Sequence, residues 1–209
     1  MINKIVETLD LLFSNPRCEL NYNKDYELLI SVMLSAQTTD IRVNSVTSIL
    51  YKKYDRLEKL ASANKEDIIN IIKPIGTYTR KSENVIEISK RLLADCDGKV
   101  INDRNYLETL PGVGRKTVNV VLSNLYDENV IAVDTHVARV AKRLNLAKID
   151  DDVLTIEKKL TKKFKNYNLG RLHHQLVLFG RYYCKAKKPE CSNCNLKDIC
   201  QFYKKINKK

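Results

Sequence analysis

A short glycine-rich turn at residues 110–114 is followed by an arginine and a lysine, so that residues 110–116 read LPGVGRK. Two of the chain's six glycines, Gly112 and Gly114, lie in this turn. Glycine adopts backbone conformations closed to other residues, and its missing Cβ lets the backbone approach a ligand. The helix expected from Arg115 onward begins where the turn ends, and a helix N-terminus attracts anions such as phosphate. The segment therefore predicts an anion site that carries the amine of Lys116.

Two interpretations of Lys116 are open from these residues alone. The 3.6-residue period of an α-helix places Lys116 about 170° from the centre of an apolar stripe, formed by Val118, Val121, Leu122 and Leu125. The lysine therefore faces away from the core, as a solvent-exposed side chain or a phosphate contact. It could also be a nucleophile, because the helix N-terminus and Arg115 both favour the neutral amine that nucleophilic attack requires.

The segment VDTH places Asp134 directly before an apolar pattern that predicts a helix over 137–144. An aspartate at this position is a common N-cap, in which the carboxylate accepts a hydrogen bond from the first helical turn. The same position fixes a carboxylate rigidly enough for an active-site base. Capping and catalysis do not exclude each other, and the sequence leaves both interpretations open.

Four of the six cysteines crowd into residues 184–200, with the spacing Cys184-x6-Cys191-x2-Cys194-x5-Cys200. In a basic chain without an export signal, clustered thiols indicate metal ligands before disulfides. Four cysteines suit both a zinc ion and a [4Fe–4S] cluster. Zinc sites more often use two short cysteine pairs, and here only Cys191 and Cys194 form one. The spacing alone leaves both metals open.

The composition favours a polyanionic partner. The chain has 209 residues, with 37 Lys and Arg against 25 Asp and Glu, and a formal net charge of +12. Nucleic acid is the simplest partner for such a balance. Aromatic residues make up 7% and Trp is absent, so a stacking surface for single strands is not indicated. The apolar N-terminal residues are interrupted by Glu7, Asp10 and Ser14, which argues against a signal or membrane-spanning segment. We therefore expect a cytoplasmic protein.

The elements that must position these residues are helices. Apolar residues recur with helical period over most of the chain, and alternating strand patterns are scarce. The best candidate strand, 130–133, is too short to build a sheet. Two turns interrupt the helical pattern, LPGVG and the segment KPIGTYTRK with Pro74 and Gly76. Proline followed by glycine ends a helix and lets the chain reverse, so KPIG could be no more than a boundary between helices.

The segment from LPGVGRK to VDTHVARVAKRLNL resembles the endonuclease III family of helix-hairpin-helix DNA glycosylases. The segments LSAQTTD and GRYYC and the cysteine tail extend the resemblance over nearly the whole chain. It implies an all-α fold with two helical domains that flank a DNA-binding cleft. A six-helix domain would span 18–130, with the hairpin motif at about 107–125. The second domain would join 1–17 to 131–209 and hold the metal loop at 184–200.

The resemblance also implies an activity and its residues. The family's enzymes remove damaged bases from duplex DNA in base excision repair and then cleave the abasic site by β-elimination. Lys116 would attack the sugar and Asp134 would assist it, with oxidised pyrimidines and abasic sites as substrates. Adenine-removing relatives lack this lysine. A monofunctional mismatch glycosylase and a non-catalytic helix-hairpin-helix DNA-binding protein remain as alternatives.

The resemblance assigns the remaining sites. The four cysteines would hold a [4Fe–4S] cluster, and the protein would act as a monomer in the cytoplasm, associated with the nucleoid. Gln37 would fill the space left by the extruded base. Many relatives carry a large apolar wedge where this chain has Thr77, so opening would depend more on Gln37 and Tyr78, unless the turn makes no DNA contact at all. The other expected DNA contacts lie in the hairpin and the cysteine loop: Gly112, Val113, Gly114, Arg115, Lys187 and Lys188.

Overall fold

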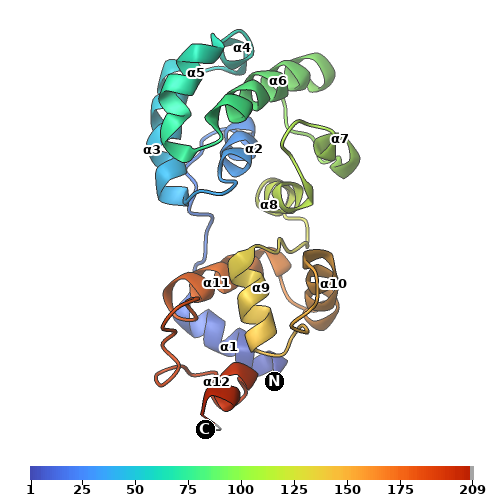
Figure 1. Cartoon of the computed structure of the whole chain (residues 1–209). Coiled ribbons are helices and arrows are strands. Elements are labelled where there is room, and N and C mark those ends of the chain that lie inside the picture. Colours follow the sequence, from blue (N-terminus) through green and yellow to red (C-terminus); the bar gives the residue numbers. More distant parts are fainter. Residues whose placement is uncertain (208–209) are drawn as a thin grey trace. The chain divides into compact units, whose positions relative to one another are not determined.

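The computed structural model describes residues 1–207, and within them the chain forms twelve α-helices, one short 3-10 helix and no strand (Figure 1). The all-α prediction is therefore confirmed. The strand considered at 130–133 is absent, and Ile131, Ala132 and Val133 are instead buried in a connecting segment. A strand needs a hydrogen-bonded partner, and no other strand is present in the described part of the chain. None of the described helices is long and apolar enough to cross a lipid bilayer.

The chain divides into two compact units, and each is described by itself. The central unit is Cys18–Tyr126, and the terminal unit joins Met1–Arg17 to the chain from Asp127 onward. The second boundary thus lies between Tyr126 and Asp127, whereas the sequence interpretation placed it at residue 130.

The central unit is arranged around one fully buried helix. In α2 (Asp25–Leu34) nine of the ten residues are buried, as expected for a helix that is apolar on all sides. Helices α3, α6 and α8 pack against it. The unit contains seven α-helices where six were expected, and two of them, α4 and α7, are short helices of five residues. The other elements are α3 Asp40–Lys53, α4 Leu57–Ala61, α5 Lys65–Ile72, the 3-10 helix Lys73–Ile75, α6 Tyr78–Cys96, α7 Arg104–Glu108 and α8 Arg115–Tyr126.

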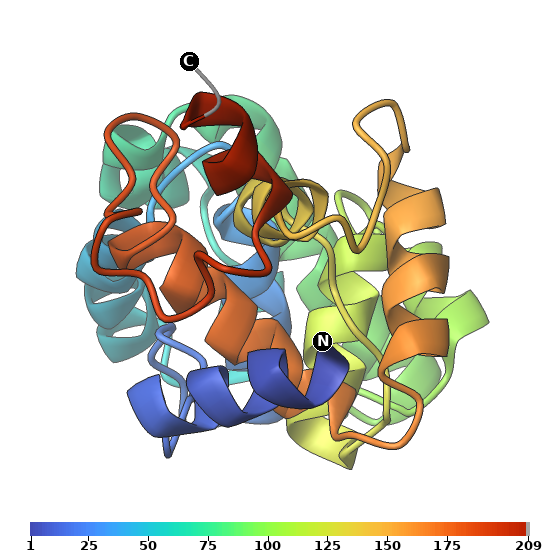
Figure 2. The ribbon, with the colours of Figure 1, turned by 90° about the horizontal axis from the view of Figure 1, so that it is seen from below.

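The terminal unit brings the two ends of the chain together. Helix α1 (Ile2–Leu12) packs along α11 (Leu169–Tyr182), and α11 also packs against α9 (Figure 2). Ile5 and Leu9 of α1 have no exposed surface. Asp10 accepts hydrogen bonds from Arg171 at 2.7 Å and from Gln175 at 2.8 Å. The remaining helices of this unit are α9 Thr135–Arg143, α10 Val153–Lys163 and α12 Gln201–Ile206.

Candidate active site and metal centre

The glycine turn between α7 and α8 is held by two inward-facing side chains, Leu110 and Val113, which are buried. Gly112 has φ +76°, and a Cβ there would lie 2.4 Å from Nδ2 of Asn84. Both the backbone conformation and the packing therefore require glycine. Gly114 is different, because a Cβ there would meet no atom within 4 Å. The protein's own packing thus explains Gly112, whereas the bare Cα of Gly114 faces open space.

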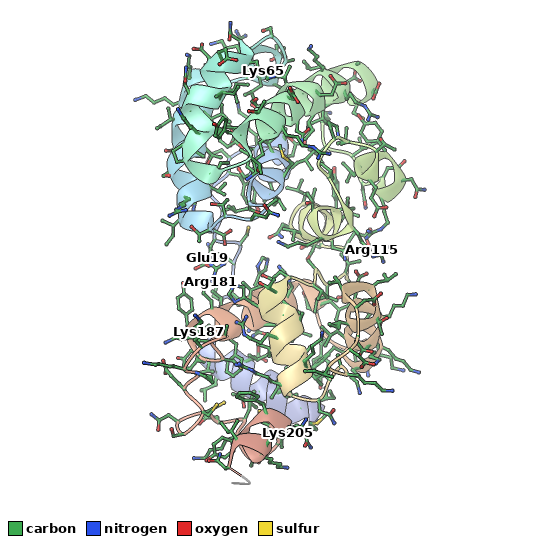
Figure 3. All side chains as sticks on the ribbon, viewed as in Figure 1. Glu19, Lys65, Arg115, Arg181, Lys187 and Lys205 are labelled. Carbon is green, nitrogen blue, oxygen red and sulfur yellow. The ribbon has the colours of Figure 1, made fainter. Side chains whose placement is uncertain are left out.

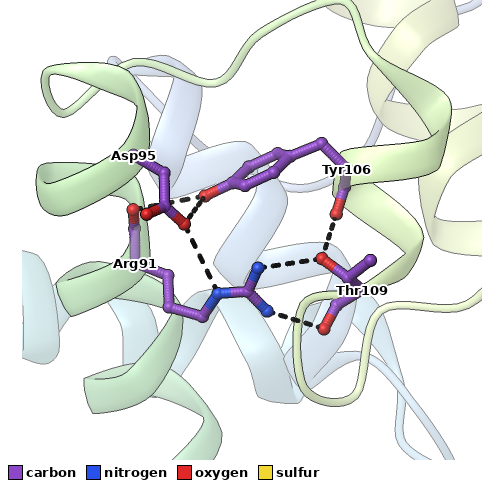
Figure 4. A network of polar contacts seen from close by, with 4 residues as sticks. All are labelled: Arg91, Asp95, Tyr106 and Thr109. Carbon is purple, nitrogen blue, oxygen red and sulfur yellow. Dashed lines mark hydrogen bonds and ion pairs between the residues drawn. The ribbon is translucent and has the colours of Figure 1, made fainter.

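A polar network fixes the chain that leads into this turn (Figure 4). Arg91 of α6 donates hydrogen bonds to the carbonyl oxygen of Thr109 at 2.8 Å and to its Oγ1 at 2.9 Å. The Tyr106 hydroxyl donates to Asp95 at 3.1 Å, and Asp95 lies 3.6 Å from Nε of Arg91. The network joins α6 to α7 and to the residue before the turn. The network therefore positions the hairpin, and no local pattern in the sequence predicted it.

Lys116 lies in the first turn of α8 and is exposed, as the helical period predicted. The helix begins at Arg115, which projects from the start of α8 (Figure 3), and ends at Tyr126, close to the expected bounds. The cysteine thiol of Cys18 lies within electrostatic reach of Lys116: burial raises the pKa of Cys18, and the charge of Lys116 acts in the opposite direction. No hydrogen bond or ion pair holds the Lys116 amine within residues 1–207, so it is available to a ligand.

Asp134 is the N-cap of α9, so the capping interpretation is confirmed. Its Oδ1 accepts a hydrogen bond from the backbone N–H of Val137 at 2.8 Å. The side chain is half-buried, and in the described chain its other oxygen, Oδ2, has no hydrogen-bond partner. The cap therefore fixes the carboxylate and leaves one oxygen for another role. Lys116 belongs to the central unit and Asp134 to the terminal unit.

Gln37 and Thr77 share an uncommon backbone conformation in the central unit. Gln37 lies between α2 and α3 with φ +60°, and Thr77 lies directly before α6 with φ +45°. Both side chains are exposed, whereas Tyr78, the first residue of α6, is half-buried. Residues other than glycine seldom adopt positive φ, and such strain often accompanies functional sites. Gln37 and Thr77, two of the three residues expected to contact DNA at the lesion, thus lie in strained, exposed turns.

The four cysteines of the terminal unit line one cavity, together with the side chains of Leu144, Phe179 and Phe202, among others. Burial, and then the neighbouring Cys184 and Cys200 thiols, raise the pKa of Cys191, which also shows that these groups lie close together. No three His, Cys, Asp or Glu side chains among the described residues are gathered closely enough for a single metal ion. Tetrahedral zinc would require four sulfurs, each about 2.3 Å from one ion. A [4Fe–4S] cluster is larger, and four cysteines around a shared apolar cavity fit it better.

Two arginines of α9 hold the cysteine loop, and sequence reasoning missed both. Arg143 donates to Sγ of Cys184 at 3.3 Å and to the carbonyl oxygen of Lys185 at 2.7 Å. Arg139 donates to the carbonyl oxygen of Cys184 at 3.0 Å and to that of Gly180 at 2.7 Å. These partners lie 41 to 45 residues away along the chain, so no local pattern could reveal them.

The lysines of the cysteine loop differ in their surroundings. Lys185 forms an ion pair with Glu190 at 2.8 Å. Lys187 and Lys188 are exposed (Lys187 is labelled in Figure 3), and neither amine has a partner within the described chain. Lys188 has φ +50°, which turns the chain sharply at this point. The loop therefore presents two unpaired positive charges to solvent.

Comparison with known proteins gives a consistent result. Residues 30–166 match the sequence profile of the HhH-GPD superfamily base excision DNA repair proteins. The chain is 44% identical over 198 residues to endonuclease III of Bacillus subtilis strain 168, covering 95% of this chain and 90% of that protein. A non-covalent endonuclease III–DNA complex superposes with a TM-score of 0.95 at 41% identity, covering 100% of this chain and 97% of that one. A trapped covalent endonuclease III–DNA intermediate gives a TM-score of 0.93 at 41% identity, with 98% and 96% covered.

Proposed function

Because this chain belongs to the HhH-GPD superfamily of base excision DNA repair proteins, and within it to the endonuclease III family, we propose how its own residues divide the work. It is a DNA glycosylase and AP lyase. The division assigns phosphate binding to the hairpin, covalent chemistry to Lys116, and proton handling to Asp134.

The hairpin binds the phosphate backbone of the damaged strand. Gly114 supports this role, since the open space beside its Cα lets a phosphate approach the backbone N–H groups at the start of α8. Gly112 and Val113 shape the turn from inside, and Arg115 adds a positive charge at its exit. Because packing and the Arg91 network fix the turn in advance, little conformational entropy is lost when DNA binds.

Lys116 is the nucleophile of both steps. Its neutral amine attacks C1′ of the damaged nucleotide, a bond forms between Nζ and C1′, and the bond from C1′ to the base breaks. The base leaves with the bonding electron pair and takes a proton from water. Oδ2 of Asp134 stabilises positive charge on the sugar and accepts the proton released by the amine. The C1′–O4′ bond then breaks, O4′ takes the proton from Asp134, and C1′ is left as a Schiff base with Lys116. Loss of a C2′ proton expels the 3′ phosphate oxygen, which cuts the strand, and hydrolysis returns the free lysine.

The cysteines hold a [4Fe–4S] cluster in our proposal, with Cys184, Cys191, Cys194 and Cys200 as ligands. When bound, the cluster supplies four covalent cross-links that order the loop, and it takes no part in the bond changes described above. The loop in turn presents Lys187 and Lys188 to DNA phosphates.

The substrate is duplex DNA that contains an oxidised or ring-fragmented pyrimidine, or an abasic site. Gln37 enters the space left by the extruded base, and Thr77 and Tyr78 contact the neighbouring base pair. A side chain inserted between base steps lowers the cost of unstacking them. The protein acts as a monomer on chromosomal DNA in the cytoplasm.

One observation carries the proposal: an exposed, unpaired lysine in the first turn after a preorganised glycine hairpin. Borohydride reduction on a duplex with one abasic site tests it, because reduction of a Schiff base leaves a stable protein–DNA adduct. We expect the adduct with the native protein and none with Lys116→Ala. An adduct of equal yield in the variant would assign the nucleophile to another residue. Base release without strand cleavage would indicate a monofunctional glycosylase instead.

A further inference from the structure

Lys81 of α6 is a buried lysine that the proposed mechanism does not use. Only 5% of its surface is exposed, which is rare for lysine unless a carboxylate pairs with it. No such ion pair is present for Lys81 in the described chain. Its Nζ donates instead to two backbone carbonyl oxygens, of Ala36 at 2.9 Å and of Ile75 at 3.2 Å. Burial lowers the pKa of Lys81.

The two carbonyl groups belong to the two turns expected to open the DNA. Ala36 directly precedes Gln37, with φ +60°, and Ile75 stands two residues before Thr77, with φ +45°. Positive φ at residues other than glycine persists only where the surrounding structure enforces it. Lys81 is the donor that contacts both turns at once, so it is placed to enforce both conformations.

A purely structural role does not require a lysine here. Burying an ammonium group costs more free energy than burying an apolar side chain of similar length, even when hydrogen bonds compensate part of the cost. Methionine or leucine would fill the same space without that cost. What lysine adds is the ability to donate to two carbonyl oxygens in different turns.

We propose that Lys81 is a positioning residue that holds the Gln37 turn and the Thr77–Tyr78 turn in one fixed arrangement for opening the base pair. The inference rests on the proposed function, which places these side chains in the DNA. A fixed pair of turns enters the duplex with little further loss of conformational freedom. Opening a stably paired lesion requires unstacking and unpairing, whereas an abasic site has no base to extrude. Lys81 should therefore matter for the first substrate and much less for the second.

The test compares single-turnover rates on two duplexes, one with thymine glycol opposite adenine and one with an abasic site. Lys81→Met keeps the length of the side chain and removes the donor. We expect it to lower the rate on thymine glycol about tenfold, the effect of losing hydrogen bonds to a charged donor, and the rate on the abasic site less than about threefold. Val85→Ala is the matched control. Val85 is buried one turn further along the same helix, and its apolar side chain forms no hydrogen bond to either turn, so its truncation destabilises α6 while the Lys81 donor stays in place.

The double variant Lys81→Met with Gln37→Ala identifies the route of the effect. If Lys81 acts through the Gln37 turn and the Thr77–Tyr78 turn, the double variant should lose less rate on thymine glycol than the product of the two single losses, because coupled residues are not additive. Multiplying losses, or equal losses on both duplexes, would overturn the inference. The inference would also be overturned if Val85→Ala changed the ratio of the rates on thymine glycol and on the abasic site as much as Lys81→Met does.

A second variant keeps the test valid if Lys81→Met does not fold. Lys81→Gln retains a donor with a shorter reach. The ratio of its rate on thymine glycol to its rate on the abasic site should lie between the ratios of the native protein and of Gln37→Ala. An unchanged ratio overturns the inference. Borohydride trapping on the abasic duplex separates this outcome from failure of the proposed function. We expect Lys116→Ala to lose the borohydride-trapped adduct, whereas the Lys81 variants should still form it at a near-native rate.

Discussion

The two glycines of the hairpin should respond to alanine in opposite ways. In Gly112→Ala the new Cβ must accept φ +76° and would lie 2.4 Å from Nδ2 of Asn84 and 3.2 Å from Cγ of Met33. The left-handed backbone costs roughly 1–2 kcal/mol, and displacing packed neighbours costs roughly 1–3 kcal/mol. The free energy of unfolding should therefore fall by about 2–5 kcal/mol, which lowers the Tm by about 5–15 °C for a chain of this length.

Gly114→Ala should leave stability unchanged or raise it by up to about 1 kcal/mol, because alanine restricts the unfolded chain and meets no neighbour in the folded one. Its Cβ would instead occupy the space proposed for a phosphate, so affinity for duplex DNA should fall at least about tenfold. Thermal unfolding followed by circular dichroism, and fluorescence anisotropy with a duplex that carries a stable abasic analogue, measure the two quantities. If Gly114→Ala loses as much stability as Gly112→Ala, or binds DNA as the native protein does, the assignment of open space to a phosphate is wrong.

Asp134→Asn should keep the cap, since asparagine caps helices as well as aspartate does, and should keep DNA binding while slowing base release about 10²–10⁴-fold in single-turnover assays; a native rate of base release would reduce Asp134 to its capping role. Replacing both Lys187 and Lys188 with glutamate should weaken binding to damaged and undamaged duplexes alike. The slope of the log binding constant against the log salt concentration should shrink in magnitude by about 2, because each phosphate contact contributes roughly −0.9. A defect confined to damaged DNA would contradict this. Anaerobically purified protein should contain about four iron atoms per chain by metal analysis, and one zinc instead would refute the cluster.

Local patterns in the sequence predicted the features that depend on neighbouring residues. The start of α8, the exposed side of Lys116 and the cap at Asp134 follow from helical period and capping chemistry, which act within one or two turns. The segment 130–133 was the best candidate for a strand but too short to build a sheet, and an apolar run of this length does not reveal whether a partner strand exists. The run is buried as a connection instead.

The contacts that hold the candidate site could not be predicted in this way. Arg143 reaches the cysteine loop 41 residues later, and Lys81 reaches Ala36 across 45 residues. In the sequence both look like ordinary surface residues of a basic chain. Their roles depend on how helices pack, which is decided by the tertiary fold and not by spacing along one helix.

The terminal unit is built from both ends of the chain, and this has a consequence for synthesis on the ribosome. Helix α1 leaves the ribosome well before α11, which covers its apolar side and begins 157 residues after α1 ends, at Leu169 against Leu12. At about 5–20 residues per second, Ile5 and Leu9 wait roughly 8–30 s for that partner. The central unit is fully synthesised within this interval and can fold first, while the first helix remains available to a chaperone. A ribosome that stalls once the central unit has left its exit tunnel, and before α11 is made, would therefore hold a folded hairpin unit tethered to an unprotected amphipathic helix.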